Sequence, residues 1–107
     1  MTRLVLALVF MVAMPQVGQA NSSFSEAQID RLIVHDSGDI LIIFPSSVNS
    51  TECGAPADML KLDGSSPLFD KIYPAILSAF HSRTTVSGWV NGCDGSPLLT
   101  RLDLHSD

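Results

Sequence analysis

Two cysteines, three histidines and eleven acidic residues could support redox, metal-binding or hydrolytic chemistry in this chain. Cys53 and Cys93 are its only cysteines, and two cysteines in an exported protein usually form one disulfide. A zinc site needs four ligands, which two cysteines without paired histidines do not complete. We therefore predict a Cys53–Cys93 disulfide. The loop of about 40 residues that it closes is worth roughly 4 kcal/mol in the chain-entropy model.

The three histidines are dispersed along the sequence at His35, His81 and His105. They fall at an expected turn, at the end of an expected helix and near the C-terminus. A metal site would need two or three of them to converge with a carboxylate, and their spacing gives no reason for this. We predict no metal site and no cofactor.

Hydrolysis by a Ser-His-Asp triad is the first enzymatic activity to consider, because all three residue types are plentiful. The nucleophile pattern G-x-S-x-G does not occur, and Gly64-Ser65-Ser66-Pro67 is better explained as the start of a helix. A small domain also has little room for a desolvated pocket of about 300–1,000 Å³. We predict that the protein is not an enzyme.

Trp89 is the residue that most strongly indicates a binding surface. In an extended strand it shares a face with Asn91, whereas Val86 and Val90 point to the opposite face. If the valines face the core, Trp89 points outward beside a polar amide, which is a common anchor for a protein or a sugar. The alternative is that Trp89 packs over the disulfide or the helix. We take Trp89 and Asn91 as the candidate binding residues.

The first twenty residues have the form of a secretory signal peptide. Thr2-Arg3 is followed by an apolar run from Leu4 to Met14, and small residues precede a cleavage point after Ala20. The alternative, a membrane anchor, would need about 20 apolar residues. We predict a signal peptide at 1–20, a single domain at 21–107, no membrane insertion after cleavage, and a secreted or periplasmic location.

The remaining 87 residues carry five basic and eleven acidic side chains, a net charge of −6. The acidic residues are scattered singly rather than clustered. This charge argues against binding to nucleic acid, which needs basic stripes, and against electrostatic docking to anionic lipid. Asn21-Ser22-Ser23 and Asn49-Ser50-Thr51 match the N-glycosylation pattern, but the short leader and compact domain are typical of a bacterial protein, so we expect no glycan.

The elements that must position these residues are five strands and one helix. Residues 21–26 are polar and are expected to be a loose terminus. Five successive apolar residues at 40–44 predict a strand covered on both faces. The last strand alternates, with Leu98, Thr100, Leu102 and Leu104 on one face. The strands are expected at 29–35, 40–44, 59–62, 85–92 and 98–105.

The helix between the third and fourth strands is indicated by an apolar stripe at helical spacing, formed by Phe69, Ile72, Tyr73, Ile76, Leu77 and Phe80. Ser66 is expected to cap it, with Pro67 in the first helical position. Pro74 conflicts with this pattern, because proline inside a helix costs about 3 kcal/mol. Either the helix kinks at Pro74 or it begins near Tyr73, and we favour the second interpretation.

This order, β-β-β-α-β-β, is that of an OB-fold barrel. The segments IYPAILSAF, TVSGWVNGC and SPLLTRLDL resemble the C-terminal half of small exported bacterial OB-fold proteins. The layout from Cys53 to Leu104 is similar to that of B subunits of pentameric toxins of the cholera and subtilase-cytotoxin kind. Cholera-type subunits place their first cysteine near the mature N-terminus, whereas Cys53 precedes the third strand, and no sugar-binding motif matches. No binding residue is carried over.

The expected fold is therefore α+β and mainly β, a small five-stranded OB-like barrel with one helix and one disulfide. The resemblance implies a secreted, non-enzymatic binding module that takes a protein or a glycan and can form a homo-oligomer. The alternative is a periplasmic or secreted inhibitor or accessory protein that acts one-to-one on its partner.

Overall fold

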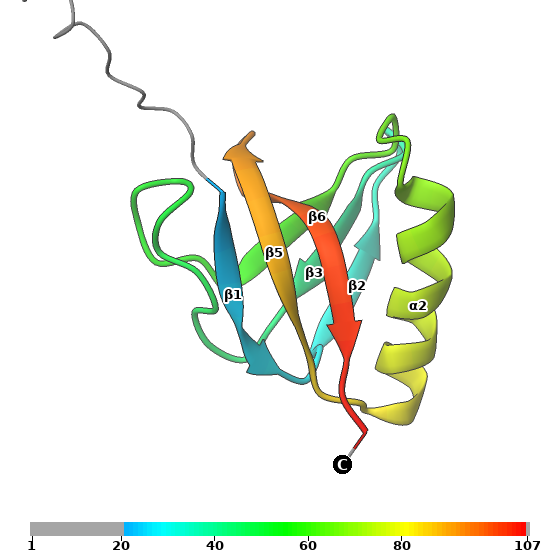
Figure 1. Cartoon of the computed structure of the whole chain (residues 1–107). Helices are drawn as coiled ribbons and strands as arrows, with labels where there is room; N and C mark the ends of the chain where they lie inside the picture. Colours follow the sequence, from blue (N-terminus) through cyan, green and yellow to red (C-terminus); the bar gives the residue numbers. More distant parts are fainter. Residues whose placement is uncertain (1–20, 107) are drawn as a thin grey trace, which may run out of the picture.

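The computed structural model describes residues 21–106, which form six strands and one helix (Figure 1). The predicted signal peptide at 1–20 lies outside the described residues. The elements are β1 Ser22–Ala27, β2 Arg31–Val34, β3 Ile40–Ile43, β4 Met59–Leu62, α2 Phe69–Ser82, β5 Val86–Cys93 and β6 Pro97–Leu104.

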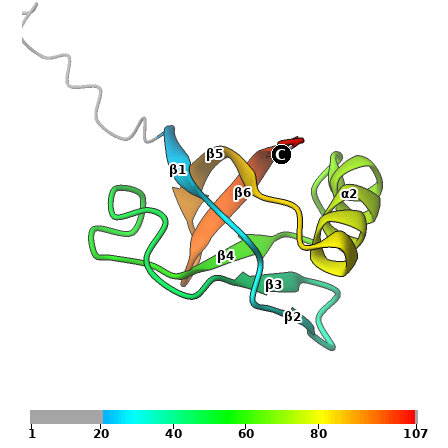
Figure 2. The same ribbon diagram turned by 90° about the horizontal axis from the view of Figure 1, so that it is seen from below.

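The strands form one sheet in the order β1-β5-β6-β4-β3-β2. All neighbours are antiparallel except β4 and β6, which run parallel and pair at Lys61 and Leu98. Figure 2 shows β1, β5 and β6 on one side of the core and β4, β3 and β2 on the other, with α2 along the flank between them. The predicted small α+β fold, mostly strands with one helix, is confirmed. The sheet has six strands and is not closed, so the five-stranded barrel is not confirmed.

The sixth strand is β1, which replaces the loose terminus expected at 21–26. It pairs with β5 through Ser22 opposite Val90 and Phe24 opposite Gly88. Phe24 is 3% exposed, and its ring centroid lies 5.8 Å from that of Phe44. One aromatic residue thus anchors an otherwise polar segment. The sequence did not indicate this strand, because a single apolar residue shows no periodicity.

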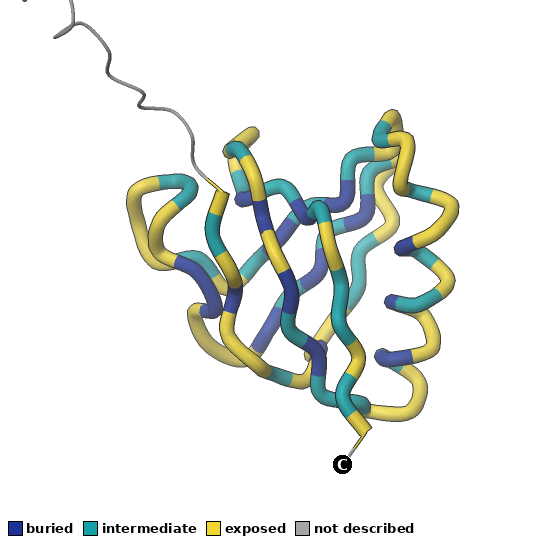
Figure 3. Tube along the Cα trace, in the orientation of Figure 1, coloured by how far each residue is buried: buried dark blue, intermediate teal, exposed yellow. Residues whose placement is uncertain are grey.

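The core lies on the inner sides of the two halves of the sheet. Ile40 and Ile42 of β3 are buried there with Leu60 and Leu62 of β4, and α2 contributes Ile72, Ile76 and Ala79 to the same cluster. Figure 3 shows the buried residues of α2 turned toward the strands. Leu41 and Ile43 point the other way and are only half-buried. The prediction that both faces of this strand are covered is therefore wrong, because the helix packs on the inner side.

The helix α2 runs unbroken from Phe69 to Ser82 with Pro74 inside it, so the start near Tyr73 that we favoured is wrong. Pro74 lies on the exposed side. The ring centroids of Phe69 and Tyr73 are 5.4 Å apart, a contact that adds to the packing of the first turns. Ser66 does not cap α2: its hydroxyl accepts the Leu68 N–H at 3.1 Å in the preceding turn.

The pairing of β5 with β6 contains a bulge beside Trp89. Trp89 pairs with Arg101 and Val90 with Leu99, which leaves Thr100 as the extra residue. Leu99 is 3% exposed and faces the core before the bulge, and Leu102 packs against the core after it. The predicted single face of Leu98, Thr100, Leu102 and Leu104 is therefore wrong, because the extra residue shifts the alternation by one.

Candidate functional site

Trp89 lies on the outer face of β5 and is 37% exposed, while Val86, Gly88 and Val90 are buried on the inner face. The outward orientation predicted from the valines is confirmed. The guanidinium carbon of Arg101 lies 5.9 Å from the centroid of the indole ring, within the range of a cation–π contact. The exposure favours a surface position over a purely packing role.

Arg101 is held in place by its own neighbour. Its Nε donates to Asp103 Oδ1 at 2.9 Å and its Nη2 donates to Asp103 Oδ2 at 3.1 Å, a bidentate pair. The hydroxyl of Thr100 donates to the Trp89 carbonyl at 3.3 Å, which fixes the bulge against β5. The indole and guanidinium groups are thus arranged before any ligand binds.

Two further polar residues share this outer face. Ser23 of β1 pairs with Trp89, so Ser23, Trp89 and Arg101 form one row across three strands. Asn91 is exposed two residues after Trp89, and its side-chain amide has no hydrogen-bond partner within residues 21–106. We call Ser23, Trp89, Asn91 and Arg101 the Trp89 surface. Ser23 and Arg101 were not singled out from the sequence, because cross-strand neighbours depend on a pairing that only the fold defines.

A hollow of about 290 Å³ adjoins the Trp89 surface, between β1 and the loop before β4. Ser23 belongs to both features. The lining is rich in hydroxyl groups and consists of Ser23, Ser25, Ser47, Val48, Asn49, Ser50 and Thr51.

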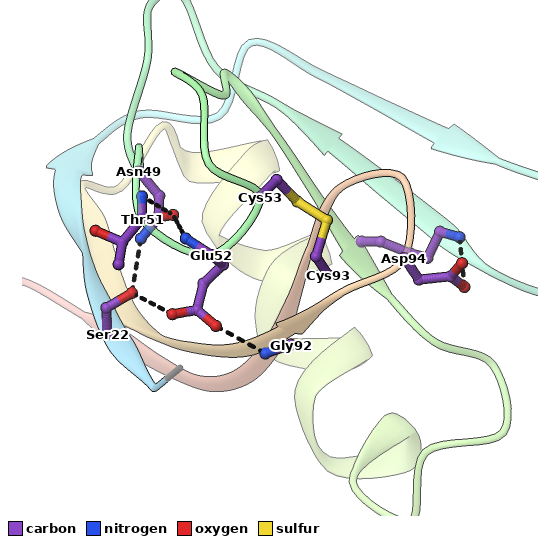
Figure 4. The surroundings of a disulfide bond; sticks show 9 residues. Ser22, Asn49, Thr51, Glu52, Cys53, Gly92, Cys93 and Asp94 are labelled. Carbon is purple, nitrogen blue, oxygen red and sulfur yellow. Dashed lines mark hydrogen bonds and ion pairs between the residues drawn. A yellow bond between two sulfur atoms is a disulfide. The ribbon is translucent and has the colours of Figure 1, made fainter. Parts of the chain in front are cut away.

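Asn49 fixes the wall of this hollow. It is 6% exposed, and its amide nitrogen donates to Ser22 Oγ at 3.0 Å (Figure 4). The same nitrogen donates to the Ser23 carbonyl at 3.1 Å. Its amide oxygen accepts the backbone N–H groups of Thr51 and Glu52, both at 3.1 Å. Glycosylation would use the same buried nitrogen, so the arrangement gives Asn49 a structural role.

The predicted disulfide is present and anchors the same loop. Cys53 and Cys93 are joined with their Cα atoms 5.3 Å apart. Beside it, the Glu52 carboxylate accepts the Gly92 N–H at 2.8 Å and the Ser22 hydroxyl at 2.7 Å, as Figure 4 shows. The loop is thereby tied to both β1 and β5, which border the Trp89 surface.

The histidines remain separate in the fold. His35 contacts Asp36 at 2.9 Å, and His81 lies near the ring of Phe80. Within residues 21–106 no group of three or more histidine, cysteine or acidic residues is placed to hold a metal ion.

His105 makes the closest approach to a hydrolytic arrangement. Its Nε2 lies 2.7 Å from Ser87 Oγ, and Asp103 is the cross-strand partner of Ser87. The Asp103 carboxylate, however, binds Arg101 rather than the imidazole. Ser87 and His105 line neither the serine-rich hollow nor a second hollow of about 250 Å³, which is lined by His35, Ser37, Asp39, Leu41 and Lys61. The pair therefore lacks the oriented carboxylate of a Ser-His-Asp triad.

No protein-family model matches the chain, and no curated protein sequence is significantly similar to it. The disulfide indicates folding in an oxidising compartment rather than in reducing cytosol. No helix in the described part of the chain is long and apolar enough to cross a membrane.

Proposed function

We propose that this protein is an exported, non-enzymatic binding module that holds a protein partner on its Trp89 surface, in the periplasm or outside the cell. The observation that carries the proposal is the 37%-exposed indole of Trp89 beside the guanidinium of Arg101. Tryptophan and arginine are enriched among the residues that dominate the binding energy of protein interfaces. Asn91 supplies a polar group at the rim.

The preformed geometry supports this use. Ordering a flexible side chain at an interface costs about 0.5–1.5 kcal/mol. Asp103 already holds Arg101, and the sheet and bulge already orient Trp89. Less entropy is then lost when a partner arrives. Such a partner fits either the binding module implied by the resemblance or an inhibitor or accessory protein acting one-to-one.

A glycan is the second candidate ligand, favoured by the serine-rich hollow beside Trp89. Sugar hydroxyls can exchange hydrogen bonds with serine and threonine, and a sugar ring can stack on an indole. One face of the indole is, however, approached by Arg101, which leaves a single face for stacking. We therefore place a protein partner first.

We also propose that the fold is a variant of the OB barrel. The resemblance in layout to toxin B subunits would then reflect this shared fold. β1 and β2 stand at opposite ends of the strand order, yet only three residues separate them in sequence. Taken as two halves of one bent strand, they reduce the six strands to five. The helix between β4 and β5 then occupies the position expected in an OB fold.

The test is capture from the envelope and medium of the native cells by the immobilised protein, followed by affinity measurement on the captured partner. Trp89→Ala is expected to weaken binding by about 2 kcal/mol, roughly thirtyfold in Kd. The matched control is Leu77→Ala, because Leu77 is 38% exposed on the distant helix. This control should bind like the wild type.

A glycan array run with the same variants separates the two ligands. Sugar binding that Trp89→Ala abolishes, without any captured protein, would favour the glycan. A partner whose affinity is the same for Trp89→Ala and the wild type would place the binding site elsewhere and refute the proposal.

A further inference from the structure

The peptide between Asn91 and Gly92 lies outside the regular pairing of β5. The register of β5 against β6 shifts between Val90 and Cys93. As a result, Asn91 and Gly92 together stand opposite one residue of β6, Leu98. Gly92 adopts a φ of 94°, in the region that glycine tolerates best. This second bulge turns the backbone N–H of Gly92 toward a partner outside the strand ladder.

That partner is the carboxylate of Glu52. Its Oε1 accepts the Gly92 N–H at 2.8 Å, and its Oε2 accepts the Ser22 hydroxyl at 2.7 Å (Figure 4). The disulfide between Cys53 and Cys93 joins the residues that follow Glu52 and Gly92. The backbone nitrogen of Gly92 is thus held in one orientation by a charged acceptor and by the neighbouring crosslink.

The side chain of Asn91 has no such restraint. Asn91 is exposed, and its amide has no hydrogen-bond partner within residues 21–106. Gly92 has no side chain that would hinder an approach to its own backbone nitrogen. An asparagine that precedes glycine is therefore the asparagine whose side-chain amide the next backbone nitrogen attacks most readily. The fold leaves the amide that would be attacked free and restrains the nitrogen that would attack it.

We propose that Asn91 is a site of spontaneous deamidation, and that the hydrogen bond from Gly92 to Glu52 sets its rate. The Gly92 nitrogen loses its proton and bonds to Asn91 Cγ, while the bond from Cγ to the side-chain nitrogen breaks. That nitrogen leaves as ammonia, which carries away the proton lost from Gly92, and a five-membered succinimide remains. Water then opens the ring at either carbonyl, which gives aspartate or isoaspartate.

The hydrogen bond to Glu52 opposes ring closure. The Gly92 nitrogen must turn toward the Asn91 side chain to form the ring, and this rotation breaks its bond to the carboxylate. A hydrogen bond to a charged acceptor is stronger than one to a neutral acceptor. The folded protein should therefore deamidate at Asn91 more slowly than the denatured chain.

The other two asparagines of the chain are poorer sites than Asn91. Asn49 is 6% exposed, and both ends of its amide are hydrogen-bonded. Asn21 is exposed but precedes a serine, whose side chain hinders approach to the serine nitrogen. We therefore expect Asn91 to be the first asparagine to convert in the folded protein.

Conversion of Asn91 changes the Trp89 surface, whichever ligand that surface binds. Each product places a carboxylate two residues from Trp89, on the same outer face of β5, where the original side chain is a neutral amide. Isoaspartate also adds a methylene group to the backbone close to Cys93. The Trp89 surface thus gains negative charge as the molecule ages.

The test is incubation of the purified, folded protein at neutral and mildly alkaline pH, followed by mass mapping of its peptides over time. Deamidation changes the peptide mass, whereas isomerisation of the two Asp-Gly sequences does not. Asn91 is expected to convert before Asn21 and Asn49. Glu52→Gln should accelerate conversion at Asn91 about tenfold, because loss of the charge weakens the bond to the Gly92 N–H.

The matched control is Glu26→Gln, which removes the same charge at an exposed position of β1 and should leave the rate unchanged. Asn91→Gln should abolish conversion at this position, because glutamine would have to close a larger ring. Circular dichroism establishes that each variant is folded. The wild type in urea should convert faster than the folded wild type, a comparison that needs no variant.

Three outcomes overturn the proposal. A folded protein in which Asn91 stays intact while Asn21 converts shows that the site is wrong. A folded Glu52→Gln variant that converts no faster than the wild type shows that Glu52 does not set the rate. A folded wild type that converts as fast as the denatured chain shows that the fold does not restrain Gly92. None of these measurements depends on the ligand of the Trp89 surface.

Discussion

At the scale of single residues, the position of Trp89 depends on the glycine that precedes it. Gly88 is buried where β5 passes close to both of its neighbours. A Cβ atom at this position would collide with the Arg101 carbonyl and would lie 2.9 Å from the ring of Phe24. Gly88 therefore permits the close approach of strands that sets Trp89 beside Arg101.

Gly88→Ala is expected to lower the free energy of unfolding by about 1–3 kcal/mol, because one added methyl group overfills a packed contact. Urea denaturation followed by tryptophan fluorescence measures the change. Asn91→Ala is the control on the same strand, and its effect should stay within about 0.5 kcal/mol, since Asn91 is exposed. Equal stability of Gly88→Ala and the wild type would show that the strands can separate at no cost.

The sequence predicts the outward orientation of Trp89 but not its neighbours. Alternation along β5 is regular through Val86, Gly88 and Val90, so the side of Trp89 follows from local pattern. Arg101 reaches the same face only because Thr100 is an extra residue opposite β5. A bulge breaks the two-residue period, and its position is set by the pairing of two strands rather than by either sequence alone.

At the scale of elements, α2 is the clearest conflict between local preference and tertiary packing. Pro74 is the sixth residue of the helix and cannot donate to the carbonyl of Asp70. Asp70 is exposed, so water can satisfy that carbonyl. Burial of Ile72 and Ile76 on the opposite side holds the helix together across the defect. Packing therefore outweighs the cost of proline here, and propensity alone placed the start of the helix too late.

Pro74→Ala is expected to raise the free energy of unfolding by about 2 kcal/mol. Removing an interior proline stabilises the helix by about 3 kcal/mol. The unfolded chain of the alanine variant is more flexible, and this offsets about 1 kcal/mol of the gain. Thermal and urea denaturation measure the gain. Ser78→Ala, at another exposed position of α2, should change stability by only a few tenths of a kcal/mol. A loss of stability in Pro74→Ala would mean that the fold requires proline at this position.

The strands differ in how far their sequences define them. β3, with its run of apolar residues, and β5, with alternating valines, are evident from composition and period. β1 has only Phe24 as a buried apolar residue, and its stability comes from pairing with β5 and from the contacts of Ser22 and Ser23 with the loop. Those partners lie far away in sequence, so no local pattern could have placed this strand.

At the scale of the whole molecule, the loop before β4 links parts of the chain that the sheet alone would leave separate. Glu52 bonds to Ser22 at the start of the described chain and to Gly92 at the end of β5. Cys53 is joined to Cys93 across a sequence separation of 40 residues. The Trp89 surface lies beside these two anchors, which hold the same end of β5. The stability of the Trp89 surface should therefore depend on both the disulfide and Glu52, but to different extents.

Replacing both cysteines, Cys53→Ser with Cys93→Ser, is expected to lower the free energy of unfolding by about 4 kcal/mol, the chain-entropy value for a loop of this length. This is a large part of the roughly 5–15 kcal/mol available to a small domain. The melting temperature should fall sharply under oxidising conditions. Reductant should destabilise the wild type to a similar extent and should leave the double variant unchanged.

The Glu52→Gln variant separates the entropic effect of the disulfide from the effect of the hydrogen bonds that Glu52 accepts from Ser22 and Gly92. Glutamine keeps one acceptor oxygen for the Gly92 N–H or the Ser22 hydroxyl but removes the charge that strengthens both bonds. Its cost should be about 1–2 kcal/mol and should be independent of reductant, because the disulfide remains. If Glu52→Gln instead cost as much as the loss of both cysteines, the hydrogen bonds and not the crosslink would hold the loop. An unchanged melting temperature in the cysteine variant would show that the two thiols are not joined.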